Sequence, residues 1–118
     1  MIAYHVSHNL WWPESSRDDA ADIQHALRKL GDLRHTVSRC KQRRVVIQAG
    51  GHAGLWPREL AKSFEQVYTA EPNPAAWSAL CKNTVEFQNV RAYCAAFGAK
   101  AGSAKMQFND NAATSKIS

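Results

Sequence analysis

A glycine-rich turn and a single acid about 20 residues further along the chain are the residues whose chemistry is most informative. The turn is Gln48-Ala49-Gly50-Gly51-His52-Ala53-Gly54, and the acid is Glu71. Clustered glycines let the backbone approach a ligand closely, and an acid at this spacing can accept hydrogen bonds from both ribose hydroxyls. Together they predict a site for a nucleoside-containing cofactor. Taken separately, the glycines also fit an ordinary tight turn, and Glu71 also fits a solvated residue before a proline.

The elements that must position these residues alternate between strand and helix. Helices are expected from Leu55 to Phe64 and after Pro72-Asn73-Pro74, between strands at 44–48, 66–71 and 89–97, with a short fourth strand at 105–108. This order predicts an α/β, Rossmann-like fold, in which helices flank a parallel sheet and a ligand lies beyond the carboxyl ends of the strands. The first strand is expected to be buried on both faces. Glu71 is expected to face the ligand crevice and not the core.

Four short motifs follow one another through this pattern. They are Gly50-Gly51-His52-Ala53-Gly54, Glu71-Pro72-Asn73-Pro74, Trp77-Ser78-Ala79-Leu80-Cys81-Lys82-Asn83 and Ala95-Ala96-Phe97-Gly98. In this order they resemble the first half of the class I S-adenosylmethionine-dependent methyltransferases, and specifically the FkbM-type family. The resemblance implies S-adenosyl-L-methionine as the cofactor and a hydroxyl-bearing small molecule or glycan as the methyl acceptor.

The resemblance also implies which residues hold the cofactor. The glycines would let the loop approach the methionine part, Glu71 would accept from the ribose diol, and Asn73 would border the adenine. The full set is Gln48, Ala49, Gly50, Gly51, His52, Gly54, Glu71, Pro72, Asn73 and Ala95. Gln48 stands where the family has an acid, so it cannot pair with the cofactor ammonium as a charge, and His52 stands where the family usually has Asn. No catalytic residue and no metal ligand are assigned.

The chain divides at the first strand of this pattern. Residues 1–43 are expected to form an N-terminal helical segment, with a helix from Ser15-Ser16 that Gly31 interrupts, and Trp11, Trp12 and Pro13 are expected to pack against it or to form a lip. The resemblance implies that residues 44–118 form a partial Rossmann-like methyltransferase domain, so the chain is expected to be an amino-terminal fragment or a truncated product. Two alternatives remain open: a catalytically inactive remnant that serves as a nucleoside-binding or interaction module, and a nicotinamide-dinucleotide-binding half domain.

Composition limits the remaining classes of protein. The 118 residues carry a net charge of +5 with 45% apolar residues, which excludes collagen-like and wholly disordered chains. The three cysteines have no metal-ligand spacing and are interpreted as reduced core thiols, and no apolar run predicts a membrane span. A cytoplasmic protein without nucleic acid as a partner is expected, because the basic cluster Cys40-Lys41-Gln42-Arg43-Arg44 is typical of a solvated flank. The uncovered edge of a three-stranded sheet predicts self-association.

Overall fold

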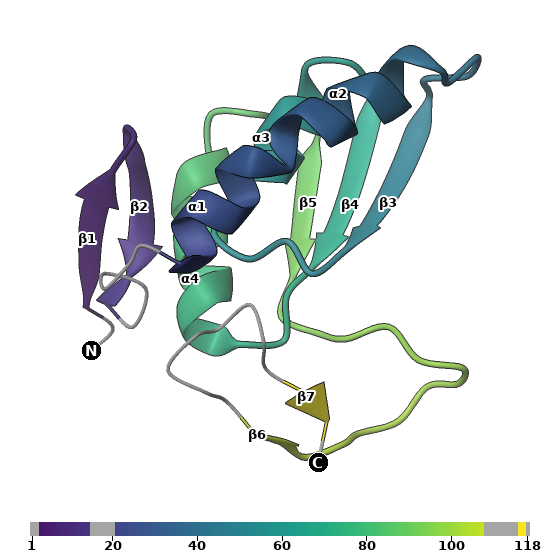
Figure 1. The fold of residues 1–118 in the computed structure, drawn as a ribbon. Coiled ribbons are helices and arrows are strands. Elements are labelled where there is room, and N and C mark those ends of the chain that lie inside the picture. Colours follow the sequence, from purple (N-terminus) through teal and green to yellow (C-terminus); the bar gives the residue numbers. More distant parts are fainter. Residues whose placement is uncertain (1–2, 15–20, 108–115, 118) are drawn as a thin grey trace.

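A computed structural model describes residues 3–14, 21–107 and 116–117 of the chain (Figure 1). The strands are β1 (Tyr4–Ser7), β2 (Leu10–Pro13), β3 (Val45–Ala49), β4 (Gln66–Ala70), β5 (Val90–Tyr93), β6 (Met106–Gln107) and β7 (Lys116–Ile117). The helices are α1 (Ala21–Arg28), α2 (Leu30–Ser38), α3 (Leu55–Ala61) and α4 (Pro74–Thr84). None of the helices in the described part is long and apolar enough to cross a membrane.

The centre of the fold is a parallel sheet with the strand order β3, β4, β5. Its register places Ile47 beside Tyr68 and Tyr68 beside Arg91. Helix α3 connects β3 to β4 and helix α4 connects β4 to β5, so the predicted α/β, Rossmann-like arrangement is confirmed. The third strand is shorter than expected, since β5 ends at Tyr93. The expected fourth strand corresponds to β6, which pairs antiparallel with β7 and does not join the parallel sheet.

Only one face of this sheet is covered. Val46, Val67 and Val90 pack against Val37 of α2 and Leu60 of α3, and both helices lie across that face (Figure 1). Ile47, which points to the opposite face, keeps 65% of its surface exposed, and Val45, Tyr68 and Tyr93 on that face are also exposed. The prediction that the first strand is buried on both faces was wrong. Among the described residues no element covers the second face.

Helices α1 and α2 are separated only by Lys29 and form a nearly continuous helical segment. The backbone N–H of Lys29 still donates to the carbonyl of His25, at 3.2 Å, and the N–H of Leu33 donates to the carbonyl of Lys29, at 3.0 Å. Gly31 lies inside α2, so the predicted interruption at that glycine was wrong. The predicted start of this helix at Ser15-Ser16 lies outside the described residues. Arg34 of α2 donates to Glu59 of α3 at 2.7 Å and joins the segment to the domain.

Helix α4 begins where the Pro-Asn-Pro sequence predicts. The side chain of Asn73 accepts hydrogen bonds from the backbone N–H groups of Ala75 and Ala76, which are otherwise left without partners at a helix start. Pro74 takes the first helical position, where no N–H donor is needed. The buried side of α4 consists of Ala76, Ala79, Leu80, Asn83 and Thr84. The helix ends at Thr84, and Val85, which follows it, is exposed.

The N-terminal residues form a β-hairpin, which was not predicted. Strands β1 and β2 pair antiparallel around a two-residue turn, His8 and Asn9, whose φ angles are +56° and +62°. Both values are typical of the turn that matches the twist of a hairpin. The hairpin packs on α4, and the ammonium of Lys82 lies 5.1 Å from the ring centres of both Tyr4 and Trp11.

The tryptophan pair and the cysteines differ in their surroundings. Trp12 is fully buried beside Ile23 of α1, as expected for packing against that helix, whereas Trp11 is 43% exposed. All three cysteines are free thiols. Cys40 and Cys81 are half-buried and Cys94 is exposed, so the expectation of a core position was wrong for Cys94. Cys94 follows β5, where the chain leaves the sheet.

Candidate functional site

A cleft of about 490 Å³ lies at the carboxyl ends of the parallel strands, where the sequence predicted a ligand. This volume is within the usual range for small-molecule sites. The residues that line it are Trp12, His25, Ala26, Gln48, Ala49, Gly50, Gly51, His52, Ala53, Leu55, Trp56, Ala70, Glu71, Pro72, Ala95, Ala96 and Phe97. Of the predicted cofactor residues, all but Gly54 and Asn73 line the cleft. The side chain of Asn73 caps α4 instead.

Glu71 lines the cleft and is also a buried structural residue. Only 5% of its surface is exposed. One carboxylate oxygen accepts the backbone N–H of His52 at 2.8 Å, and the other accepts the backbone N–H of Asn73 at 3.0 Å. Glu71 therefore joins the loop after β3 to the turn that starts α4. The expectation that it faces only the crevice was wrong, because it also holds the two segments that form the crevice.

The two hydrogen bonds leave Glu71 able to accept more. An ionised carboxylate has about four acceptor sites, and the two backbone N–H groups occupy two of them. A hydrogen bond that a ligand makes to this largely buried carboxylate would be stronger than one made in water. The carboxylate thus retains the capacity to accept two hydroxyl groups from a ligand in the cleft.

Gln48 makes hydrogen bonds within the protein through both ends of its side-chain amide. Its oxygen accepts from the Thr69 hydroxyl at 2.6 Å, and its nitrogen donates to the carbonyls of Ala49 and Gly50 at 3.1 and 3.2 Å. The amide therefore fixes the start of the glycine turn relative to β4. A carboxylate at this position could not donate to those carbonyls, so Gln48 gives the turn its shape and adds no charge to the cleft.

The three glycines of the turn have different roles. A Cβ atom on Gly51 would overlap Thr69 Oγ1, and one on Gly54 would lie 3.1 Å from Leu80 Cδ1. Gly54 also has φ +100°, so both positions require glycine for packing inside the protein. Gly50 has φ +74° and has open space beside it. Of the three, Gly50 best fits the predicted close approach to a ligand.

The backbone N–H groups of the turn are directed inward. Those of Gly50 and Gly51 donate to the carbonyl of Ala70 at 2.8 and 3.0 Å, and that of His52 donates to Glu71. The turn is therefore closed onto the end of β4, and these three N–H groups hold it there. A ligand at the turn would contact open backbone surface beside Gly50.

Several cleft residues were not predicted. His25 and Ala26 come from α1, and Trp56 comes from the first turn of α3. The indole nitrogen of Trp56 donates to the carbonyl of Ala26 at 3.1 Å, which attaches α1 to the rim of the cleft. Trp56 is an aromatic residue two positions after Gly54 at the start of a helix, and this position was a usable signal in the sequence. Nothing local in the sequence indicates that α1 reaches the cleft.

Cys94 lies beside the cleft with a raised pKa. Burial is the main cause and the nearby charge of Glu71 is the second, because both disfavour the thiolate. Burial, followed by the proximity of Cys94, also raises the pKa of Cys81. Both groups are therefore thiols at neutral pH. No group of three or more potential metal ligands occurs among the residues that the structure describes.

The chain was compared with known protein families, curated sequences and solved structures. No family model and no curated protein sequence matches it. Solved structures that resemble it include ErmE, TYW2 and Trm5b. The 23S rRNA methyltransferase ErmE is 25% identical with a TM-score of 0.50, over 55% of this chain and 28% of that one. The TYW2 protein of M. jannaschii in complex with AdoMet is 22% identical with a TM-score of 0.55, over 80% and 43%.

The third structure is Trm5b from Pyrococcus abyssi, which is 18% identical with a TM-score of 0.57, over 80% of this chain and 28% of that one. The likeness is to the class I S-adenosylmethionine-dependent methyltransferases, and it confirms the fold. This chain spans between 28% and 43% of the length of the three structures. It therefore has the fold of one part of such a methyltransferase.

Proposed function

We propose that this chain binds S-adenosyl-L-methionine in the cleft and forms the cofactor-binding part of an FkbM-type methyltransferase. The observation that supports this best is the position of Glu71. Its carboxylate lies at the carboxyl end of β4, lines the cleft and has two acceptor sites left for the ribose hydroxyls. The order of the four sequence motifs supports the FkbM type.

The composition of the cleft suits this cofactor. Trp12, Trp56 and Phe97 line it together with the small residues Ala95 and Ala96, and Glu71 is the only carboxylate among its lining residues in the described part of the chain. Aromatic faces attract cations, and apolar walls accept a nucleobase. A cofactor with a sulfonium group, an adenine ring and a ribose diol is matched by such a site.

The cofactor supplies an electrophilic methyl group that is already activated by the positive sulfur. The residues of this chain therefore need only bind and orient it. Glu71 holds the ribose, the open backbone at Gly50 admits the methionine part, and the aromatic residues exclude water. The acceptor that we propose is a hydroxyl oxygen of a small molecule or glycan, which would lie on the same side of the cleft as the methyl group.

Calorimetry with S-adenosylhomocysteine, with NAD as the competing candidate, tests the proposed cofactor. We expect S-adenosylhomocysteine to bind with measurable heat and to raise the melting temperature, and NAD to bind more weakly or not at all. Tighter binding of NAD would replace this proposal with a nicotinamide-dinucleotide-binding half domain.

A second function is favoured by one observation. Gln48 is neutral and both ends of its amide are occupied within the protein, so the cleft has one carboxylate where the FkbM pattern has two. A chain that binds the cofactor without transferring its methyl group, as a binding or interaction module, would show this feature. Incubation with methyl-labelled S-adenosylmethionine and a panel of hydroxyl-bearing acceptors separates the two functions, because only the enzyme transfers the label.

A further inference from the structure

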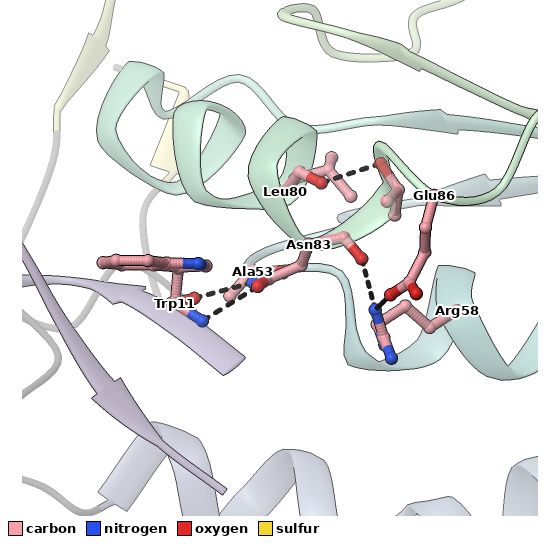
Figure 2. Close-up of polar contacts among 7 residues, drawn as sticks. Trp11, Ala53, Arg58, Leu80, Asn83 and Glu86 are labelled. Carbon is pink, nitrogen blue, oxygen red and sulfur yellow. Dashed lines mark hydrogen bonds and ion pairs between the residues drawn. The ribbon is translucent and has the colours of Figure 1, made fainter. Parts of the chain in front are cut away.

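Asn83 makes three side-chain hydrogen bonds to two segments outside α4. It lies near the end of α4 and is 4% exposed. Its side-chain oxygen accepts the backbone N–H of Trp11 at 2.8 Å, and its side-chain nitrogen donates to the carbonyl of Trp11 at 2.7 Å and to the carbonyl of Ala53 at 2.6 Å (Figure 2). One amide group therefore links the N-terminal hairpin, the glycine turn and α4.

The orientation of this amide is fixed by its partners. The oxygen faces one N–H donor, whereas the nitrogen faces two carbonyl oxygens and uses both of its hydrogens. A rotated amide would place an oxygen against two oxygens in a buried site, which is costly. The side chain bonds to both backbone groups of Trp11, as a neighbouring strand would. It therefore gives hydrogen-bond partners to an N–H and a C=O group at the edge of β2.

The end of α4 that carries Asn83 is itself fixed to α3. The backbone carbonyl of Asn83 accepts a hydrogen bond from Arg58 at 2.6 Å, and Arg58 also pairs with Glu86 (Figure 2). The guanidinium of Arg58 lies 5.0 Å from the ring centre of Phe87. Asn83 therefore projects from a rigid support, and the segments bound to its side chain are positioned by it.

The residues next to the two partners of Asn83 line the cleft. Trp12 follows Trp11, and His52 precedes Ala53. The rings of Trp12 and His52 have centres 5.9 Å apart, and the indole of Trp12 is held by a 2.8 Å hydrogen bond to the carbonyl of Ser7. A displacement of the hairpin relative to the glycine turn would thus separate two walls of the cleft.

We propose that Asn83 is a positioning residue which sets the N-terminal hairpin against the glycine turn, so that Trp12 forms one wall of the ligand site. The positioning role of Asn83 rests on the proposed function only in one respect, which is that the ligand of the cleft is S-adenosyl-L-methionine. The position of Trp12 in the folded chain is independent of any ligand.

The test compares two Asn→Asp substitutions. Asn83→Asp keeps the shape and the acceptor that receives Trp11 N–H but removes both donors to the carbonyls. Asn89→Asp is the matched control, because the Asn89 nitrogen also donates to two carbonyls, those of Ala61 and Phe64 at 2.9 Å each, beside the start of β5. Both variants lose two hydrogen bonds of the same type, and only the first loses them at the cleft.

Two measurements are made on both variants. In NMR spectra of the ligand-free chain, Asn83→Asp should shift the indole N–H resonance of Trp12 more than that of Trp77, whose indole donates to Ala92 on the sheet. Asn89→Asp should leave the Trp12 resonance in place. In calorimetry, Asn83→Asp should raise the Kd of S-adenosylhomocysteine by about tenfold, while Asn89→Asp should change it by less than about twofold.

Each result bears on one proposal. An unmoved Trp12 resonance in folded Asn83→Asp overturns the positioning role, as does a loss of affinity equal to that of Asn89→Asp. A moved resonance in a chain whose wild type binds no S-adenosylhomocysteine retains the positioning role and rejects the proposed cofactor. If Asn83→Asp does not fold, Asn83→Ser takes its place, because its single hydroxyl can donate to only one of the two carbonyls, and the same two criteria apply.

Discussion

At the scale of single residues, the site is built from groups that each hold the protein together as well as facing the cleft. Glu71 bonds two loops, Gln48 bonds the glycine turn to β4, and Gly51 leaves room for Thr69. Substitutions here will therefore change stability and ligand affinity together. The change in stability and the change in affinity therefore have to be measured separately on the same variant.

Glu71→Gln tests this double role. The amide can still accept one backbone N–H, but its nitrogen would face the other, so a buried donor loses its partner. We expect the free energy of unfolding to fall by about 1–3 kcal/mol and the Kd of S-adenosylhomocysteine to rise tenfold or more. Chemical denaturation and calorimetry on one preparation measure both. Glu65→Gln is the control. The Glu65 side chain is exposed and its Oε2 lies 3.9 Å from Nε of the likewise exposed Arg44, so we expect no change in the free energy of unfolding or in the Kd.

An unchanged stability with a large loss of affinity would show that Glu71 acts only on the ligand. A loss of stability with an unchanged Kd would place Glu71 outside the cofactor site. The second result would leave the proposed function resting on the glycine turn.

Gly51→Ala tests whether the turn is packed against β4. The added Cβ atom overlaps Thr69 Oγ1 and lies 3.0 Å from Leu80 Cδ2, so we expect a loss of about 1–3 kcal/mol in the free energy of unfolding. Gly31→Ala is the matched control with the opposite sign. It lies in α2 with open space around it, and alanine there should stabilise the chain by about 0.5–1 kcal/mol. Equal effects at the two sites would contradict the packing shown by the structure.

At the scale of elements, the ion pair between α2 and α3 makes stability depend on pH. The hydrogen bond from Arg34 holds the pKa of Glu59 below its ordinary value of 4.5. Because the folded pKa is lowered, this contribution is fully present above pH 4.5 and disappears as the pH falls through the folded value. Glu59→Gln should therefore destabilise the chain modestly at pH 7.

Denaturation curves of wild type and Glu59→Gln at several pH values check this prediction. The difference between the two should shrink as the pH is lowered below 4.5. If the difference in the free energy of unfolding stays constant down to about pH 3, the charge of Glu59 contributes nothing to the stability of the chain.

The elements also show which parts of the fold the sequence could predict. Strands β3 to β5 and helices α3 and α4 follow local signals, such as the Asn73 cap and the short runs of β-branched residues, and these were found. The β1–β2 hairpin was missed because His8-Asn9 lacks the glycine usual in such turns and because two adjacent tryptophans break the alternation. The burial of β3 was misjudged because the covering of a strand depends on elements distant in sequence.

The same distinction applies to the candidate site. The carboxyl ends of β3 and β4 could be located from the sequence, so the glycine turn and Glu71 were placed correctly at the cleft. Their hydrogen-bond partners could not be predicted, because the N–H of His52 and the carboxylate of Glu71 come together only when the turn folds back on β4. His25 was missed for the same reason, since it reaches the cleft through the packing of α1 on α3, whereas the position of Trp56 at the start of a helix was a signal that could have been used.

At the scale of the whole molecule, the edge of β3 that faces away from β4 favours association with a second copy of the chain. In the described residues β3 pairs only with β4, so its other edge has backbone groups free for a further strand, and Val45 and Ile47 are exposed beside it. Two such edges can pair around a two-fold axis. We therefore expect the chain to form dimers as its concentration rises.

Ile47→Lys tests the proposed dimer. A lysine on β3 should weaken the dimer at least about tenfold in analytical ultracentrifugation, because pairing the two β3 edges brings the like charges of the two copies close together. Val85→Lys is the control, since Val85 is 82% exposed but follows the end of α4 and belongs to no strand of the sheet. A chain that stays monomeric at high concentration, or two variants that associate alike, would contradict the proposal.

The hydrogen bonds between Trp11 and Asn83 also set an order of events during synthesis. The two residues are 72 positions apart, and a growing chain adds about 5–20 residues per second. The hairpin is therefore translated several seconds before α4, the helix on which it docks, and Trp11 lacks its partner Asn83 during that interval. Closing so long a loop is slow relative to local folding. The nascent hairpin therefore exposes Trp11 to a ribosome-associated chaperone until the end of α4 that carries Asn83 emerges.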